Sequence, residues 1–170
     1  KQKILERGEI LRSVNGFTLV ELLLVLVIIG VFTGGVVVSL KGRQNHYALN
    51  VSSNDLAEAI RYAAYESRMR EMPHRVVFRN ERSYRVEKQQ SGFQGNYMPV
   101  TGVAGRVNTL KGNVRIAGFF NRDGKALVPV PESVVFDQSP NTFSGRICLQ
   151  EDLGRTVVIV VNGVSGQVGI

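Results

Sequence analysis

The stretch NGFTLVELLLVLVIIG, Asn15–Gly30, belongs to the most apolar part of the chain and yet contains a carboxylate, Glu21. From Phe17 to Leu40, Glu21 is the only ionisable side chain. A helix of this length spans roughly 36 Å, enough for a tilted crossing of a hydrocarbon core about 30 Å thick. The sequence therefore predicts a membrane-spanning helix at residues 17–40. An unpaired charge is expensive in lipid, so Glu21 needs a specific reason to be there.

The residues on either side of this segment indicate its orientation. Residues 1–16 are charged and contain no apolar stretch of their own, and Lys41 and Arg43 follow the segment. The apolar run is longer than that of an ordinary secretory signal, and no small-residue cleavage site follows it. By the positive-inside rule we expect the short N-terminal segment in the cytoplasm and the larger C-terminal part outside.

The part of the chain after Leu40 has the composition of a soluble domain. The 170 residues carry a net charge of +7, and seventeen basic against eleven acidic residues lie from Lys41 onward. This excess permits contact with anionic lipid, nucleic acid or an acidic partner, and it selects none of them. Cys148 is the only cysteine, which excludes an intramolecular disulfide, and we expect it in the core.

The helix is expected to continue beyond the apolar segment as an amphipathic extension at residues 41–73. Apolar residues recur with helical spacing, at Leu56, Ala59, Ile60, Ala63 and Ala64. Pro73 disfavours helix at the residue before it and is expected to end the helix near there. The first half of such a helix needs lipid or other helices around it, and the second half needs a sheet to cover.

Short β-rich runs in residues 74–170 predict that sheet. HRVVFR and SYRVEK flank a turn at residues 80–82, and GRICLQ and RTVVIVVN flank another at residues 151–154, so each pair predicts a hairpin. The run TVVIVV is uninterrupted and apolar, which predicts a central strand covered on both faces. Weaker strand candidates are MPVTGVAG, RVNTL, NVRIAGFF, SVVFD and GQVGI. The predicted class is α+β, with one long N-terminal helix packed on a mostly antiparallel sheet.

Several of these stretches together resemble a known family. GFTLVE, Gly16–Glu21, after a charged leader and before an apolar helix, is similar to the type III signal of type IV pilins and type II secretion pseudopilins. LAEAIRYAAYESRMREMPHRVVF resembles the passage from helix to first strand in GspH/FimT-type minor pilins and pseudopilins. The later strands resemble that family more loosely. The resemblance implies a type IV pilin-like fold.

The resemblance also implies roles for residues of the apolar segment. Residues 1–16 would be a leader that a prepilin peptidase removes by cutting after Gly16, and Phe17 would become an N-methylated N-terminus. Glu21 would pair with the N-terminal amine of a neighbouring subunit or of its own chain. Local unwinding or close packing of helices in a filament is implied for three glycines, Gly30, Gly34 and Gly35.

The implied function is that of a minor pseudopilin of a type II secretion system. The processed chain would wait in the bacterial inner membrane with its head in the periplasm, then join a periplasmic pseudopilus that drives exoprotein export. Implied partners are other pseudopilins or pilins, the prepilin peptidase, the inner-membrane assembly platform and secreted cargo. The alternative is a FimT/FimU-like minor pilin of a type IV pilus, acting in pilus assembly, motility or DNA uptake. A membrane-anchored enzyme is the third hypothesis.

The head contains one candidate anion site and no catalytic pattern. A weak anion or DNA patch is formed in sequence by Arg75, Arg79, Arg82 and Arg85, for which an ordinary solvated face is the preferred interpretation. DNA-binding members of the family carry a C-terminal G-R-x-R element, and residues 166–169 here read GQVG, which disfavours nucleic acid. His46 and His74 are far apart in sequence and lack ligand-spaced neighbours. We therefore expect no metal, no cofactor and no enzymatic activity.

Overall fold

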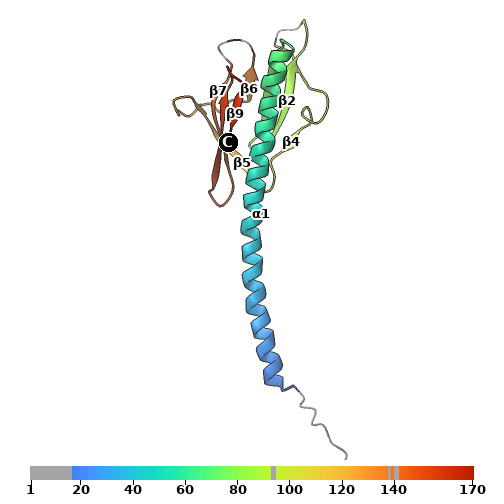
Figure 1. The fold of residues 1–170 in the computed structure, drawn as a ribbon, viewed down its shortest axis with the longest axis vertical. Helices are drawn as coiled ribbons and strands as arrows, with labels where there is room; N and C mark the ends of the chain where they lie inside the picture. The colour runs from blue at the N-terminus through green and yellow to red at the C-terminus, as the bar shows by residue number, and fades with distance from the viewer. Residues whose placement is uncertain (1–16, 93–94, 138, 140–141) are drawn as a thin grey trace, which may run out of the picture. The chain divides into compact units, whose positions relative to one another are not determined.

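The computed structural model describes residues 17–92, 95–137, 139 and 142–170; the side chains of residues 33–46 are outside this description. The chain divides into two compact units, Lys1–Lys41 and Gly42–Ile170. The predicted leader, residues 1–16, lies outside the described residues. The helix α1 (Leu19–Met69) supplies residues to both units, and all the strands belong to the second unit (Figure 1).

The two ends of α1 are set by local backbone chemistry. The helix begins directly after Thr18 and runs through Gly30, Gly34 and Gly35. It ends at Met69, somewhat earlier than the predicted residue 73, and Glu71 follows with a positive φ of 52°. A residue in this left-handed conformation commonly terminates a helix, which explains an end ahead of Pro73. Within the described part of the chain, no helix meets the length and apolarity needed to cross a membrane.

The strands form two antiparallel sheets in place of the single sheet that was predicted. The first sheet has the order β3-β2-β1-β6, and β4 also pairs with β2. Its strands are β1 (His74–Asn80), β2 (Ser83–Gln89), β3 (Tyr97–Pro99), β4 (Asn108–Thr109) and β6 (Ser133–Phe136). The second sheet has the order β5-β7-β8-β9. Its strands are β5 (Arg115–Asn121), β7 (Ser144–Gln150), β8 (Thr156–Asn162) and β9 (Gln167–Gly169).

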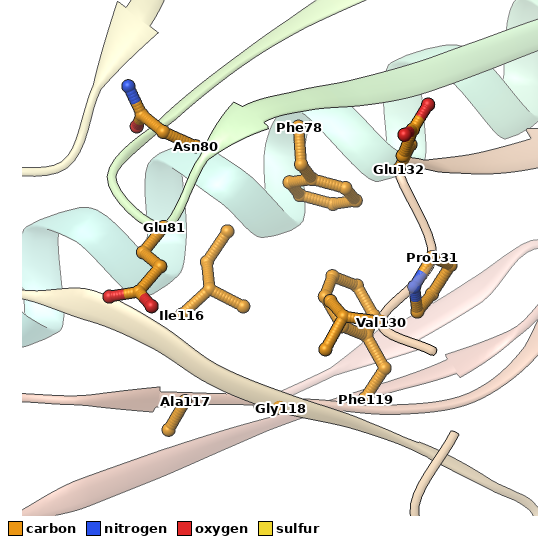
Figure 2. Close-up of a pocket in the computed structure, with 10 residues that line it drawn as sticks. All are labelled: Phe78, Asn80, Glu81, Ile116, Ala117, Gly118, Phe119, Val130, Pro131 and Glu132. Atoms are coloured by element: carbon orange, nitrogen blue, oxygen red, sulfur yellow. The ribbon is translucent and has the colours of Figure 1, made fainter. Parts of the chain in front are cut away.

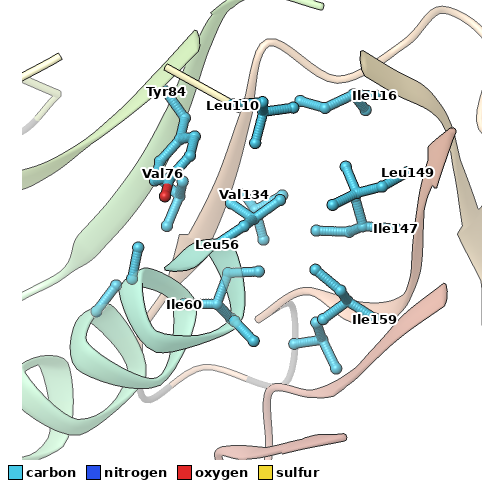
Figure 3. Close-up of a cluster of buried hydrophobic side chains, with 14 of the residues drawn as sticks. Leu56, Ile60, Val76, Tyr84, Leu110, Ile116, Val134, Ile147, Leu149 and Ile159 are labelled. Carbon is cyan, nitrogen blue, oxygen red and sulfur yellow. The ribbon is translucent and has the colours of Figure 1, made fainter. Parts of the chain in front are cut away.

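The core of the second unit lies where α1 meets both sheets, as Figure 3 shows. Leu56 and Ile60 of α1 are fully buried, and the other apolar positions predicted from helical spacing are buried as well. The first sheet contributes Val76, Val86 and Val134, and the second sheet contributes Ile147, Leu149 and Ile159. The α+β class, with a helix packed on antiparallel sheets, is therefore confirmed, and both predicted hairpins are present as β1–β2 and β7–β8.

The prediction that β8 is covered on both faces is wrong. Ile159 and Val161 are buried, whereas Val158 and Val160 keep 39% and 49% of their surface exposed. An antiparallel sheet commonly has one face on the core and one face in solvent, and this sheet follows that rule. The uninterrupted apolar run therefore supplies both a core face and an exposed apolar face.

Two further expectations for the strands need correction. Cys148 is only half-buried, because Ile147 and Leu149 take the core side of β7 and Cys148 points the other way, opposite Val158. The segments MPVTGVAG and RVNTL, predicted as weak strands, form only the short β3 and β4. NVRIAGFF forms the full strand β5, with a register shift between Ile116 and Gly118.

Candidate functional site

The first turn of α1 is closed by a hydrogen bond between Thr18 and Glu21. The backbone N–H of Glu21 donates to Thr18 Oγ1 at 3.3 Å and to the Thr18 carbonyl at 3.1 Å. Thr18 directly precedes the helix and Glu21 is its third residue, so the sequence T-L-V-E matches the S/T-x-x-E capping box. The Thr18 side chain makes its half of this box by accepting from the Glu21 backbone N–H. The box was missed in the sequence, although the spacing of threonine and glutamate was visible there.

The position of Glu21 is also favourable for its charge. It lies in the first turn of α1, where the unpaired N–H groups and the helix dipole favour a carboxylate by about 0.3–1 kcal/mol. Its side chain is exposed, so the carboxylate can accept hydrogen bonds from a cationic group outside the chain. The charge of Glu21 is thus favourably placed for the helix and open to a partner.

The apolar side chains next to Glu21 are exposed. Large hydrophobic residues from Phe17 to Phe32 each keep at least 44% of their surface accessible. An apolar surface that surrounds a helix is stable only in lipid or against other apolar helices. This segment therefore needs an external apolar environment.

The remaining residues predicted for this segment are described only in part. Phe17 lies before the helix and is exposed. A Cβ added to Gly30 would meet no heavy atom within 4 Å, so the surface there is open to close approach. Gly16 lies outside the described residues, and so do the surroundings of Gly34 and Gly35. The roles in processing and packing stay predictions.

The comparisons with known proteins bear on this same segment. Residues 11–37 match the family model described as the prokaryotic N-terminal methylation motif. The chain carries a prepilin-type signal. This match supports a type IV pilin-like or pseudopilin protein, and such a signal implies processing by prepilin peptidase and assembly with other pilins. Neither the comparison with curated proteins nor that with solved structures found a match.

The predicted anion patch is divided among contacts inside the chain. Arg75 donates to Glu87 Oε2 from Nε at 2.8 Å and from Nη2 at 2.6 Å, and Arg85 Nε donates to Glu87 Oε1 at 2.6 Å. The Arg75 guanidinium also lies 4.0 Å from the ring centroid of Tyr97. Burial of Glu87 favours its protonated form, but the two arginines outweigh this effect and lower the pKa of the carboxyl.

The other two arginines of the patch do not join this cluster. Arg82 Nη2 donates to the carbonyl of Gly112, and Arg79 is exposed near the end of β1. Only Arg75 and Arg85 are therefore brought together, and Glu87 neutralises one of their two positive charges. Burial of Glu87 could not be inferred from the sequence, because charged and apolar residues alternate in its strand.

Two arginines of α1, Arg61 and Arg68, hold the C-terminal hairpin. The Arg68 guanidinium donates to the carbonyls of Ser165 at 2.6 Å, Val164 at 2.7 Å and Gly163 at 3.0 Å. Arg61 Nη2 donates to the carbonyl of Val168 at 2.9 Å. These contacts fix the β8–β9 turn against the helix. Within residues 166–169, where the arginine element would lie, Val168 is held by Arg61 through its backbone carbonyl.

A cavity of about 300 Å³ lies between the end of β1 and β5. Figure 2 shows Phe78, Phe119, Ile116 and Val130 around it, while the carboxylate of Glu132 points away from the two rings. Phe78 and Phe119 meet edge to face, with ring centroids 5.0 Å apart. The lining is mainly apolar and lacks the converging polar groups typical of a catalytic pocket. It fits the space between two sheets better than a substrate site.

The described residues contain no group of three or more His, Cys, Asp or Glu that could hold a metal ion. His74 is buried in β1, and its Nδ1 donates to the carbonyl of Met72 at 2.8 Å. Burial lowers the pKa of His74 despite this bond, which favours the neutral ring. His74 therefore has a structural environment, and the candidate functional site remains the N-terminal segment.

Proposed function

We propose that this chain is a minor pseudopilin of a type II secretion system, with a mechanical and non-enzymatic role. Residues 1–16 form a cytoplasmic leader, residues 17–40 lie in the inner membrane, and residues 41–73 extend the helix to a periplasmic head at residues 74–170. Cleavage after Gly16 releases the chain for assembly, helix beside helix, into a periplasmic pseudopilus. Growth of this filament drives export of exoproteins.

The observation that supports this proposal is the placement of Glu21 in the first turn of an exposed apolar helix that carries a prepilin-type signal. At the centre of a membrane-spanning helix a charged side chain costs about 2.5–3.5 kcal/mol on insertion scales, and the cost is smaller in the first turn, where Glu21 lies. Cleavage before Phe17 creates an ammonium group close to this carboxylate in sequence. Pairing with that group, in the same chain or in a neighbour, offsets the cost of burying the charge. When the amine belongs to a neighbour, neutralising Glu21 requires that the two subunits assemble.

Two substitutions at Glu21 separate pairing from capping. Glutamine at this position keeps the capping box and removes the charge, whereas alanine removes both. We expect Glu21→Gln and Glu21→Ala to insert into the membrane normally and to lose most of the co-purification of two differently tagged copies. Thr18→Ser, which keeps the cap, serves as the control. If Glu21→Gln assembled like the wild type, the pairing role would be refuted.

A pilus role as a FimT/FimU-like minor pilin is the competing proposal. The arginines of the head favour secretion, because Arg75, Arg85 and Arg82 are engaged inside the chain and residues 166–169 lack arginine. We expect deletion of the chain from its host to stop exoprotein export while DNA uptake and motility remain. Gel-shift titration of the full chain with duplex DNA over a salt series is the second test. Tight binding with a steep salt dependence would favour the pilus proposal.

A further inference from the structure

The outer face of the second sheet combines apolar and basic side chains. Val158 and Val160 lie exposed on β8, and Arg146 on β7 is the cross-strand partner of Val160. Arg122, just after β5, is exposed and donates to Asn162 Oδ1 at 3.5 Å. Among the described residues, Arg146 forms no salt bridge with a carboxylate. We call this surface, defined by Val158, Val160, Arg122 and Arg146, the basic face.

A groove of about 610 Å³ lies between α1 and the chain around β4. Asp55 and Glu58 of α1 line it together with Tyr62, and Val103 and Val107 form its exposed apolar edge. In the described part of the chain neither carboxylate takes part in a salt bridge. We call this surface the acidic groove.

The two carboxylates create a negative potential within the groove, and this potential affects the pKa of a neighbouring tyrosine. Burial, and then the charges of Asp55 and Glu58, raise the pKa of the Tyr84 hydroxyl, which also lines the groove. Lys111 is the one cation among the lining residues and leaves the groove with a net negative charge. A guanidinium with apolar neighbours is therefore the complementary ligand, since its charge meets the carboxylates while its neighbours cover Val103 and Val107.

The basic face supplies this ligand. We infer that the basic face of one copy docks on the acidic groove of a second copy, with Arg146 directed to Asp55 and Glu58 and with Val160 against Val107. The inference rests on the proposed function, because it specifies how heads of neighbouring subunits meet in the filament. Both surfaces pair apolar side chains with charges of opposite sign, and this complementarity identifies the occupant of the groove as the same chain.

The contact is heterologous, since the two surfaces are different. In Figure 1, β2 and β4 lie on one side of the helical part of the head, and β7 and β9 lie on the other. One head can therefore use both surfaces at once, and a heterologous contact that does not close into a ring extends into a filament. Exposed ion pairs are individually weak, so the contact depends on apolar helices that already hold neighbouring chains together at high effective concentration.

Cysteine cross-linking of the full chain in membranes tests this contact. Val107 and Val160 have matched exposures, 50% and 49%, and are replaced together by cysteine in a Cys148→Ser background. Mild oxidation is expected to give a ladder of dimer, trimer and higher species. Each single cysteine variant is expected to stay monomeric, and a mixture of the two single variants is expected to stop at dimer.

Charge reversal gives an independent control on the same readout. Arg146→Glu is expected to reduce the dimer band, which contains one such contact, about fivefold, the upper range for an exposed ion pair. Adding Asp55→Lys and Glu58→Lys to that variant is expected to restore the band. Arg79→Glu, which reverses an exposed arginine of the other sheet, is the matched control and is expected to leave the ladder unchanged.

Co-purification of two tagged wild-type copies separates failure of this contact from failure of the proposed function. Normal co-purification with no ladder overturns the docking inference and leaves the filament proposal in place. A dimer from Val160→Cys alone shows a symmetric contact and also overturns it. Loss of co-purification in the wild type contradicts the proposed function, and the docking inference fails with it.

Discussion

Replacing Glu87 by glutamine tests the polar cluster on the first sheet. Glu87 is 2% exposed and receives charge-assisted hydrogen bonds from Arg75 and Arg85, whose side chains are 29% and 22% exposed. Glutamine has nearly the same shape but no charge, and its amide nitrogen cannot accept a hydrogen bond. The substitution therefore leaves two guanidinium groups without their counter-ion and changes the packing little.

The size of the effect follows from the burial of the three groups. Breaking a fully buried ion pair by removing one partner costs about 3–5 kcal/mol. Here both arginines keep contact with water, which compensates part of the loss, so we expect a decrease of about 2–3 kcal/mol in the free energy of unfolding. For a domain of this size the expected drop in melting temperature is roughly 6–15 °C.

The assay is unfolding of the full chain in detergent micelles, followed by tyrosine circular dichroism with urea or heat. Glu81→Gln, an exposed carboxylate in the adjoining turn, is the control and is expected to change stability by less than about 0.5 kcal/mol. Because folding lowers the pKa of Glu87, its stabilisation is present above the unfolded pKa of about 4.3 and is lost as pH falls through the folded value. A variant as stable as the wild type, or with the same acid dependence, would refute the reasoning.

Three further predictions use the same unfolding assay. Because burial lowers the pKa of His74, we expect the free energy of unfolding to fall as pH drops below about 6.5, and His74→Phe to remove that part of the slope. A Cβ at Gly163 would lie 2.2 Å from the Phe143 carbonyl oxygen, so Gly163→Ala should cost about 2 kcal/mol or more, whereas Gly169→Ala, with open space, should be nearly neutral. Ile60→Ala should cost about 3–4 kcal/mol, since the side chain is fully buried between helix and sheets.

Much of the fold could be predicted from local patterns in the sequence. Helical spacing identified the buried face of α1 around Leu56 and Ile60, and turn residues between β-rich runs identified both hairpins. The division into two sheets could not be predicted, because strand pairing depends on contacts far apart in sequence. The exposure of one face of β8 could not be predicted for a related reason. An apolar run such as TVVIVV carries no information about which of its faces the core will cover.

The candidate site was predictable to different extents in its two parts. The signal around Glu21 is contiguous, so the sequence alone pointed to it, and residues 11–37 match the methylation motif. Whether the four arginines form an exposed patch was not predictable, because their hydrogen-bond partners lie elsewhere in the sequence. Glu87 faces Arg75 across the β1–β2 pair, and Gly112 accepts from Arg82 across thirty residues of sequence. The number of arginines counted in the sequence was therefore larger than the number that remain free to bind an anion at the surface.

The capping box at Thr18 and Glu21 does not explain why its acidic position is charged, because glutamine serves equally well there. Charge at a helix N-terminus is worth about 0.3–1 kcal/mol, whereas a carboxylate in the lipid interior costs about 2.5–3.5 kcal/mol. At the bilayer centre this would leave a shortfall of roughly 2 kcal/mol, and the cost is smaller for a residue in the first turn, closer to the interface. Glutamine at the same position would cap the helix without this cost. If capping were the whole role, Glu21→Gln would assemble as well as the wild type or better. A loss of assembly with glutamine, together with normal membrane insertion, would mean that the charge itself is used, with the N-terminal amine of the same chain or of a neighbour as its partner.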